Sequence, residues 1–261
     1  MDAGGGVVST PLAALGLFGD AVTFIFQSQE SRTGGDAVGG LSDFGGMAWT
    51  HLQVVLASVA LACVVALPVG LVLGHLRRGG FLAVSVSNVG RAVPSLALIA
   101  VFIAFLGATF LNVTVALALL AIPPILTNTY VGVTQVDREV IDAAEGQGLT
   151  GAQVIREVEL PLALPLIFGG LRTSVVNVIA TATIAPIAGV VTLGDPIFSQ
   201  SVYGDQGKLA AAIVVALMAI VAEVGLGAAQ RAVTPRPLRG TPGATRRGRF
   251  LPTLRNGAPT P

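Results

Sequence analysis

Residues 52–74 read LQVVLASVALACVVALPVGLVLG and carry no charged side chain. A helix that crosses a membrane needs about 20 mostly apolar residues, and this stretch meets that length. Two charged residues, Arg77 and Arg78, follow shortly after it. The stretch therefore predicts a transmembrane helix.

The composition places the whole chain in a bilayer. Of its 261 residues, 53% are hydrophobic and only 11% are charged, and the mean hydropathy is +0.80. Soluble domains carry roughly 25% charged residues. So few charges could not cover the surface of a water-soluble protein, and we therefore expect an integral membrane protein.

Further apolar segments predict further spans. Residues 92–136 contain no charge and are too long for one helix, but the polar break from Gly107 to Asn112 would split them into a hairpin. We therefore predict an all-α integral membrane protein with about five transmembrane helices. In chain order, the expected spans are 52–74, 81 or 84 to 106, 113–133, one within 161–190, and 209–230.

The basic residues predict the orientation, because cytoplasmic loops carry an excess of Lys and Arg. With five spans, the two ends of the chain fall on opposite sides. One side holds only Arg32 and Lys208, whereas the other holds Arg77, Arg78, Arg138, Arg156 and a tail with seven arginines and no acid. The N-terminus should lie outside and the C-terminus in the cytoplasm.

Three regions follow from this organisation. Residues 1–48 would form an N-terminal extracytoplasmic or interfacial segment, in which the apolar stretch 11–26 is either an interfacial helix or a weak extra span. Residues 49–232 would form the transmembrane domain. Residues 233–261 are rich in Pro, Gly and Arg and predict a disordered cytoplasmic tail; contact with anionic lipid head groups is the alternative.

The chain offers no catalytic or metal-binding constellation. Cys63 is the only cysteine, and His51 and His75 have no Glu or second His at ligand spacing, so we interpret both histidines as interfacial residues. No phosphate-binding loop of the type Gly-x-x-x-x-Gly-Lys-Ser/Thr occurs. We expect no bound cofactor, no metal and no enzymatic activity.

The loop 136–161, between the third and fourth spans, has a helical pattern. Small apolar residues recur at helical spacing from Val136 to Ala144, with charges on the other face. Gly148 can end that helix in a left-handed conformation. Thr150, with Gln153 three residues later, predicts a capping box and a second short helix, which would stop at Leu160-Pro161, where Pro161 opens the next span.

The first of these helices has the features of a docking surface. Ala143 and Ala144 would let another surface approach the backbone closely, and Arg138, Asp142 and Glu145 would set the orientation at the rim. Helices that rest on lipid are rich in Lys and Arg, whereas residues 137–159 hold six acids and two arginines. The pattern favours a protein partner over lipid.

The loop resembles the coupling motif of binding-protein-dependent, type I ABC-importer permeases. That motif runs Glu-Ala-Ala, three residues, Gly, nine residues, Ile-x-Leu-Pro. The corresponding residues here are Asp142-Ala143-Ala144, Gly148 and Val158-Glu159-Leu160-Pro161, with two conservative departures, Asp142 and Val158. The resemblance implies that residues 142–148 dock into a groove of an ATPase subunit, with Leu160 and Pro161 anchoring the loop.

A second resemblance, over about residues 50–232, is to permeases for osmoprotectants such as glycine betaine, choline, carnitine or proline. It rests on the stretches 93–98, 128–130, 159–165, 177–183 and 193–198. The two resemblances imply an ATPase dimer that binds ATP and Mg, a second permease copy or a related permease, an extracytoplasmic binding protein, and the bacterial cytoplasmic membrane. The alternatives are the same architecture importing another solute, such as an amino acid, or an ATPase-independent channel.

Polar and kinking residues within the spans are the candidates for a translocation pathway, although hydrogen bonding between helices is the commoner use of such polar groups. Ionised groups in a span are costly: Glu223 would face a partner helix, pair with Arg91 or reach the interface, and Arg91 and Arg172 would lie in cytoplasmic parts of their spans. We expect structural roles for all three. The pathway candidates are Pro94, Ser95, Asn128, Asn177, Thr181 and Thr183.

Overall fold

The computed structural model describes residues 11–35, 37–81, 85, 90 and 93–234. A short antiparallel hairpin of two strands, β1 and β2, pairs Ser28 with Gly39 and Glu30 with Ala37. The other regular elements of the described residues are helical. In chain order with the two strands, the elements are α1 (Pro11–Phe26), β1 (Ser28–Glu30), β2 (Ala37–Gly39), α2 (Gly40–His75), α4 (Ser95–Leu106), α5 (Phe110–Thr134), α6 (Arg138–Gly146), α7 (Gly151–Gln153), the π-helical η1 (Val154–Glu159), α8 (Leu160–Thr181), the 3₁₀-helical η2 (Ala182–Ala188), α9 (Asp195–Phe198) and α10 (Gln200–Val233).

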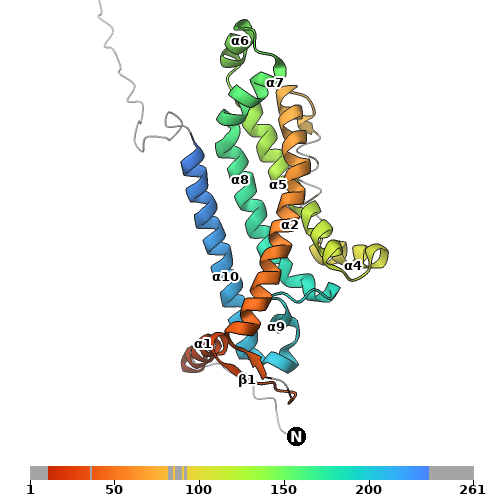
Figure 1. Cartoon of the computed structure of the whole chain (residues 1–261), viewed down its shortest axis with the longest axis vertical. Coiled ribbons are helices and arrows are strands. Elements are labelled where there is room, and N and C mark those ends of the chain that lie inside the picture. The colour runs from red at the N-terminus through yellow and green to blue at the C-terminus, as the bar shows by residue number, and fades with distance from the viewer. Residues whose placement is uncertain (1–10, 36, 82–84, 86–89, 91–92, 235–261) are drawn as a thin grey trace, which may run out of the picture.

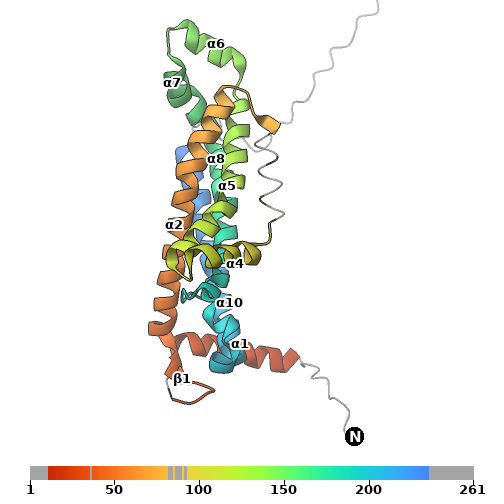
Figure 2. The ribbon, with the colours of Figure 1, turned by 90° about the vertical axis from the view of Figure 1, so that its right-hand side faces the viewer.

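Helices α2, α5, α8 and α10 run along the long axis of the molecule (Figure 1). The loop that contains α6 and α7 lies at one end, and α1 lies across the opposite end, at a steep angle to the long helices (Figure 2). Within the described residues, four helical segments are long and apolar enough to cross a membrane: Gly40–His75, Phe110–Thr134, Gly151–Ala188 and Gln200–Val233. The all-α membrane fold is confirmed.

The second expected span differs from a single helix over 81 or 84 to 106. Part of it lies outside the described residues; residues 81, 85 and 90 are helical, and after Pro94 the chain forms α4, which projects from the side of the bundle (Figures 1 and 2). Pro94 has ψ 122° and has no backbone N–H, and a proline also disfavours helical geometry in the residue before it. The break at Pro94 agrees with its prediction as a kinking residue, whereas the extent of the span before it lies partly outside the described residues.

The polar break after α4 forms the predicted turn. Gly107 adopts φ +73°, a conformation in which a side chain would be strained. Thr109 caps α5, since its Oγ1 accepts a hydrogen bond from the Asn112 N–H at 3.2 Å, and the Asn112 Nδ2 donates to the Gly107 carbonyl at 2.7 Å. These bonds satisfy backbone groups that a helix end leaves without partners.

Two of the long helices extend beyond the apolar stretches that predicted them. α2 begins at Gly40 rather than near residue 52, and α10 begins at Gln200, with a kink at Gly204, rather than near residue 209. Apolarity marks the part of a helix that lies in lipid and not its full length.

His51 is fully buried between α2 and α8, with its Nε2 3.0 Å from the Ile179 carbonyl oxygen, and its place at the membrane interface stays a prediction.

The core lies where α2 and α8 pack against α5. Its buried members include Val55 and Ala62 of α2, Leu117 and Ile125 of α5, and Ile179 of α8. Close packing at small residues replaces the hydrophobic effect as the force between helices in lipid. At Gly170 of α8, for example, an added Cβ would lie 2.7 Å from the Pro124 carbonyl oxygen and 2.7 Å from the Asn128 Cβ.

Two adjacent glycines of α8 test this packing. We expect Gly170→Ala to destabilise the protein by about 1–3 kcal/mol, because the methyl group meets backbone of α5. Gly169→Ala is the matched control, since a Cβ there meets nothing within 4 Å. Thermal unfolding of the detergent-solubilised protein checks the difference, and equal unfolding temperatures for both variants would contradict the close contact.

Candidate functional site

The loop between α5 and α8 has the local structure that its sequence predicts. Asp137 caps α6, because its Oδ1 accepts a hydrogen bond from the Glu139 N–H at 3.1 Å. Gly148 follows α6 with φ +89°, the predicted left-handed turn. The predicted capping box is present, with the Gln153 side-chain oxygen accepting from the Thr150 N–H at 2.8 Å.

The second helix of the loop does not stop at Leu160-Pro161, contrary to expectation. α7 continues through the π-helical η1 into α8, and the Leu160 N–H donates to the carbonyl of Ile155, five residues back. Pro161 has no N–H to donate and its ring crowds the carbonyl four residues before it. A wider turn just before Pro161 removes that conflict without ending the helix.

The loop has a small hydrophobic core of its own. Val136, Ile141, Ala144 and Val154 are buried against one another. Ala144 is only 7% exposed, whereas its neighbour Ala143 lies on the exposed face of α6. Of the two alanines expected at the docking surface, Ala143 is therefore accessible to a partner and Ala144 supports the helix from inside.

Two contacts fasten the loop to the end of α2. The Arg77 Nη2 donates a hydrogen bond to the Val136 carbonyl at 2.9 Å. The His75 Nδ1 lies 2.9 Å from Glu159 Oε2, and Glu159 is only 1% exposed. Local sequence patterns predict neither contact, because the partners are 59 and 84 residues apart in the chain.

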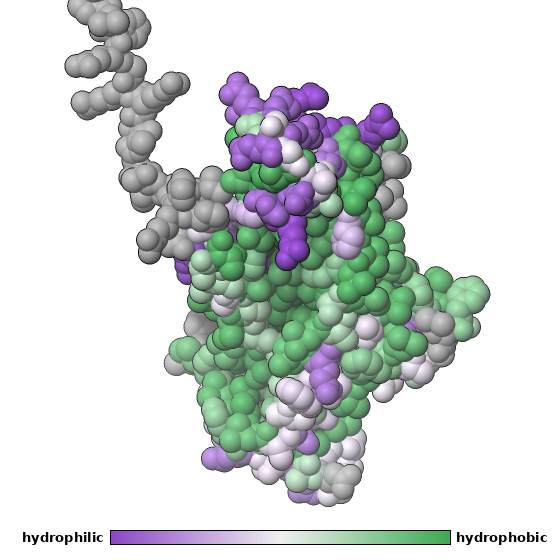
Figure 3. Space-filling model, turned by 45° about the horizontal axis from the view of Figure 1, so that its top comes forward, coloured by the Kyte–Doolittle hydropathy of each residue, from purple (hydrophilic) through white to green (hydrophobic). Residues whose placement is uncertain are grey.

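The outer face of the loop is polar and open. Figure 3 shows hydrophilic residues gathered over the end of the molecule that carries α6, above apolar flanks. A groove of ≈ 560 Å³ runs beside α6, and its lining includes Val140, Ala143 and Glu157. The exposed predicted residues of the loop are Arg138, Asp142, Ala143, Glu145 and Gly148. Ala143 lines this groove, whereas Arg138, Asp142 and Glu145 line a separate cavity beside the end of α2.

The structure brings together some of the predicted pathway residues. Ser95, Asn177 and Thr181 line one cavity of ≈ 490 Å³, together with Thr173 and two prolines of α5. Pro94 is the exposed residue next to Ser95. We call the surface formed by Ser95, Pro123, Pro124, Thr173, Asn177 and Thr181 the translocation groove, after the role that the sequence predicts for Ser95, Asn177 and Thr181, which stays a prediction.

Two predicted pathway residues do not line the groove. Asn128 donates from Nδ2 to the Pro124 carbonyl at 2.8 Å and packs against Gly170. Thr183 donates to the Ala180 carbonyl at 2.7 Å. In the described part of the chain, both side chains bond within their own helical segments.

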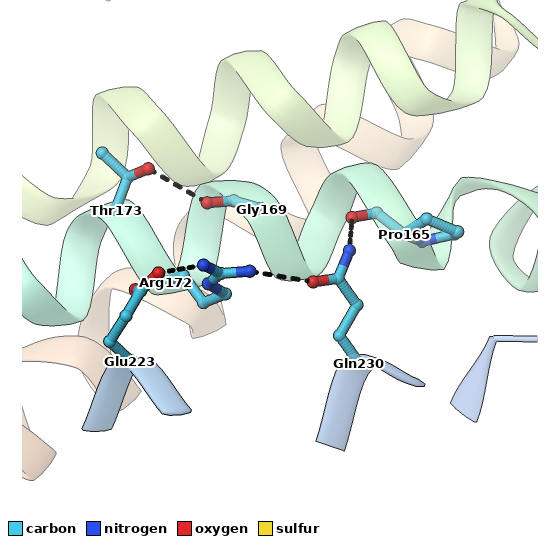
Figure 4. Close-up of polar contacts among 6 residues, drawn as sticks. All are labelled: Pro165, Gly169, Arg172, Thr173, Glu223 and Gln230. Carbon is cyan, nitrogen blue, oxygen red and sulfur yellow. Dashed lines mark hydrogen bonds and ion pairs between the residues drawn. The ribbon is translucent and has the colours of Figure 1, made fainter. Parts of the chain in front are cut away.

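A polar network joins α8 to α10 within the membrane-length helices (Figure 4). Arg172 and Glu223 form an ion pair. Gln230 accepts from the Arg172 Nη1 at 3.4 Å and donates to the Pro165 carbonyl at 2.8 Å. The sequence analysis did not pair these two charges, although each is the only charged residue in its predicted span; Arg91, the partner considered for Glu223, lies outside the described residues.

Comparison with known proteins identifies the family. Residues 66–239 match the family described as "Binding-protein-dependent transport system inner membrane component". The chain is 37% identical over 191 residues to the glycine betaine/carnitine/choline transport system permease protein OpuCB of Bacillus subtilis, covering 73% of this chain and 88% of that protein. It is 39% identical over 192 residues to the carnitine transport permease protein OpuCB of Listeria monocytogenes, with the same two coverages.

Solved structures agree in fold. The MetNI methionine ABC transporter in an inward-facing conformation matches with a TM-score of 0.65 at 22% identity, covering 74% of this chain and 96% of that chain. An amino acid ABC transporter crystallised with histidines matches with a TM-score of 0.57 at 20% identity, covering 72% and 93%. The chain therefore belongs to the family of binding-protein-dependent transport system inner membrane components, the permeases of ABC importers.

Proposed function

We propose that this permease imports osmoprotectants of the glycine betaine, carnitine, choline or proline type. The observation that carries the solute class is the 37–39% identity, over 73% of the chain, to permeases named for such solutes. Relatives named for choline alone match over a similar length. ATP hydrolysis belongs to a partner subunit, and we propose that ATP and Mg are bound there and that this chain binds no cofactor.

The exposed face of α6 is the proposed docking surface for the ATPase. Ala143 is the exposed residue that leaves room for close approach, and Arg138, Asp142 and Glu145 lie together on another side of α6 as charged groups that orient the contact. Gly148 makes the turn that presents α6, and Ala144 supports it from the loop core. Leu160 and Pro161 anchor the loop where η1 joins α8.

The same contacts support a mechanism of coupling by shape. The loop is fastened to α2 by Arg77 and His75 and is continuous with α8. Closure of two ATPase subunits would carry α6 with them and shift α8. Because α8 also carries Thr173, Asn177 and Thr181, this shift would open or close the translocation groove.

An ABC importer of this family works with an ATPase and a binding protein, and we propose the remaining assembly. Two permeases, identical or related, would enclose the solute path between them. The basic residues favour a cytoplasmic position for the end that carries α6 and for the tail 233–261, with residues 1–48 outside. Figure 2 has α1 across the end of the bundle opposite α6, an orientation that supports an interfacial helix rather than an extra span.

Uptake in cells tests the proposed function. Cells that lack the gene should lose uptake of labelled glycine betaine or carnitine at high osmolarity and regain it from a plasmid copy. A panel that includes choline, proline and methionine, measured in a strain without other osmolyte importers, defines the solute. Gene-dependent uptake of methionine alone would replace the osmoprotectant assignment with an amino-acid one.

A matched pair of alanines tests the docking surface. We expect Ala143→Arg to reduce ATP-driven uptake by about tenfold or more, because a long charged side chain cannot be buried in a close contact without a large desolvation cost. Gly148→Asp should do the same, since φ +89° strains any residue with a side chain. Ala152→Arg, also exposed in the loop but outside α6, is the control. Co-purification of the ATPase with Ala143→Arg at the wild-type level would contradict docking at α6.

Glu159 and Glu157 test how the loop is anchored. Glu159→Ala removes the partner of His75, and we expect the loop to open more easily by about 1–3 kcal/mol. Glu157 is exposed, and Glu157→Ala should have little effect. Hydrogen exchange of the amides in residues 138–149 measures the opening, and similar exchange in both variants would show that the His75–Glu159 contact does not hold the loop.

A further inference from the structure

The two charges in α8 and α10 are isolated in apolar surroundings. Arg172 is the only charged residue from Pro161 to Ala188, and Glu223 is the only one from Leu209 to Gln230. Arg172 lies about three turns along α8 from its start at Leu160, roughly 18 Å at 1.5 Å per residue. Both charges therefore lie within helical segments that are long and apolar enough to cross a membrane.

The pair is accessible from a cavity rather than closed in the core. The side chains of Arg172 and Glu223 are 34% and 42% exposed. They open on a hollow of ≈ 470 Å³, which is also lined by Gly169, Thr173 and Asn177. Sites for small ligands typically have volumes of this order.

This hollow adjoins the translocation groove. Thr173 and Asn177 line both cavities, so the two share one face of α8. The charge pair therefore stands at the edge of the groove, within reach of a solute that moves along Thr173 and Asn177.

A purely structural role explains these residues poorly. An ion pair taken out of water recovers little more than its desolvation cost, and apolar residues of similar volume often hold helices together as well. Ionised groups inside a membrane usually face a pathway or a partner. Gln230 holds the Arg172 guanidinium by a second contact, and Arg172 and Glu223 both line the hollow.

We propose that Arg172 and Glu223 form a binding site for a zwitterionic solute within the membrane, an inference that rests on the proposed function. The carboxylate of the solute binds the Arg172 guanidinium, and its cationic group binds the Glu223 carboxylate. Binding replaces the Arg172–Glu223 ion pair by two ion pairs with the solute, and the occupied site carries no net charge. No covalent step is involved.

The site distinguishes zwitterions from simple cations. Glycine betaine, carnitine and proline carry both charges, whereas choline carries only the positive one. Choline at Glu223 would leave the Arg172 guanidinium without its counter-ion at membrane depth, which is costly. The permease itself thereby favours a zwitterionic osmoprotectant over choline.

Single-charge variants of the complete transporter test this site. Uptake of labelled glycine betaine and of choline is measured at sub-saturating concentration for wild type, Arg172→Gln and Glu223→Gln. Every variant receives solute from the same binding protein. The selectivity of the binding protein therefore cancels when the choline-to-betaine uptake ratio of a variant is divided by that of the wild type. Arg172→Gln leaves a negative site and should raise the choline-to-betaine uptake ratio about tenfold; Glu223→Gln leaves a positive site and should lower it by a similar factor.

The controls separate the outcomes. Arg231→Gln removes an exposed positive charge at the end of α10 and should leave the ratio unchanged. If a single variant fails to insert, the neutral pair Arg172→Gln/Glu223→Gln is measured instead and should lose about tenfold in betaine uptake at normal abundance. If a single-charge variant loses uptake of betaine and choline equally, or if the neutral pair takes up betaine at the wild-type rate, the zwitterion site is wrong and the proposed function still stands. Uptake of neither solute by wild type overturns the proposed solute class, and this site with it.

Discussion

Close contacts between helix backbones hold the bundle together. At Gly74 of α2, an added Cβ would lie 2.7 Å from the Val133 Cβ, and at Gly132 of α5 it would lie 3.1 Å from the Ala163 Cβ. Lipid is as apolar as a leucine side chain, so only packing and hydrogen bonds can hold helices to one another in it. The small residues therefore fix how α2 and α8 sit on α5, and every other feature of the molecule is placed by that arrangement.

The position of the loop follows from this packing. Gly74 is next to His75, so the contact that fixes the end of α2 also fixes the residue that meets Glu159. Arg77, two residues after His75, donates a hydrogen bond to the Val136 carbonyl just after α5. The loop is thus held at both of its ends by groups that the bundle has already positioned, and its own core of Val136, Ile141, Ala144 and Val154 keeps α6 in shape.

The sequence predicted the features that depend on local patterns. Apolar runs indicated the spans, Gly107 the hairpin turn, Gly148 the left-handed turn and Thr150 the helix start, because each depends on residues close in the chain. Contacts between distant segments left no such signal. Nothing near Arg172 in the chain indicates Glu223, and nothing near His51 indicates the Ile179 carbonyl. The part of α2 that precedes residue 52 could not be predicted either, since a helix outside lipid needs no apolar run.

The two sides of α10 show why the charge pair belongs with the groove. One side exposes Leu217, Val221 and Val224, which are 55–70% exposed and suit lipid or a second permease. The other side turns Glu223 and Gln230 toward α8, where they meet Arg172 and Pro165 (Figure 4). Helix α8 continues through η1 to the loop that carries α6, and the helical segment Gly151–Ala188 holds Arg172 of the charge pair and Thr173, Asn177 and Thr181 of the groove. A displacement of the loop along that segment moves Arg172 relative to Glu223, because the two charges lie on different helices. Closure of an ATPase would therefore change the distance between the two halves of the proposed zwitterion site, which is the change that a transporter needs to release its solute.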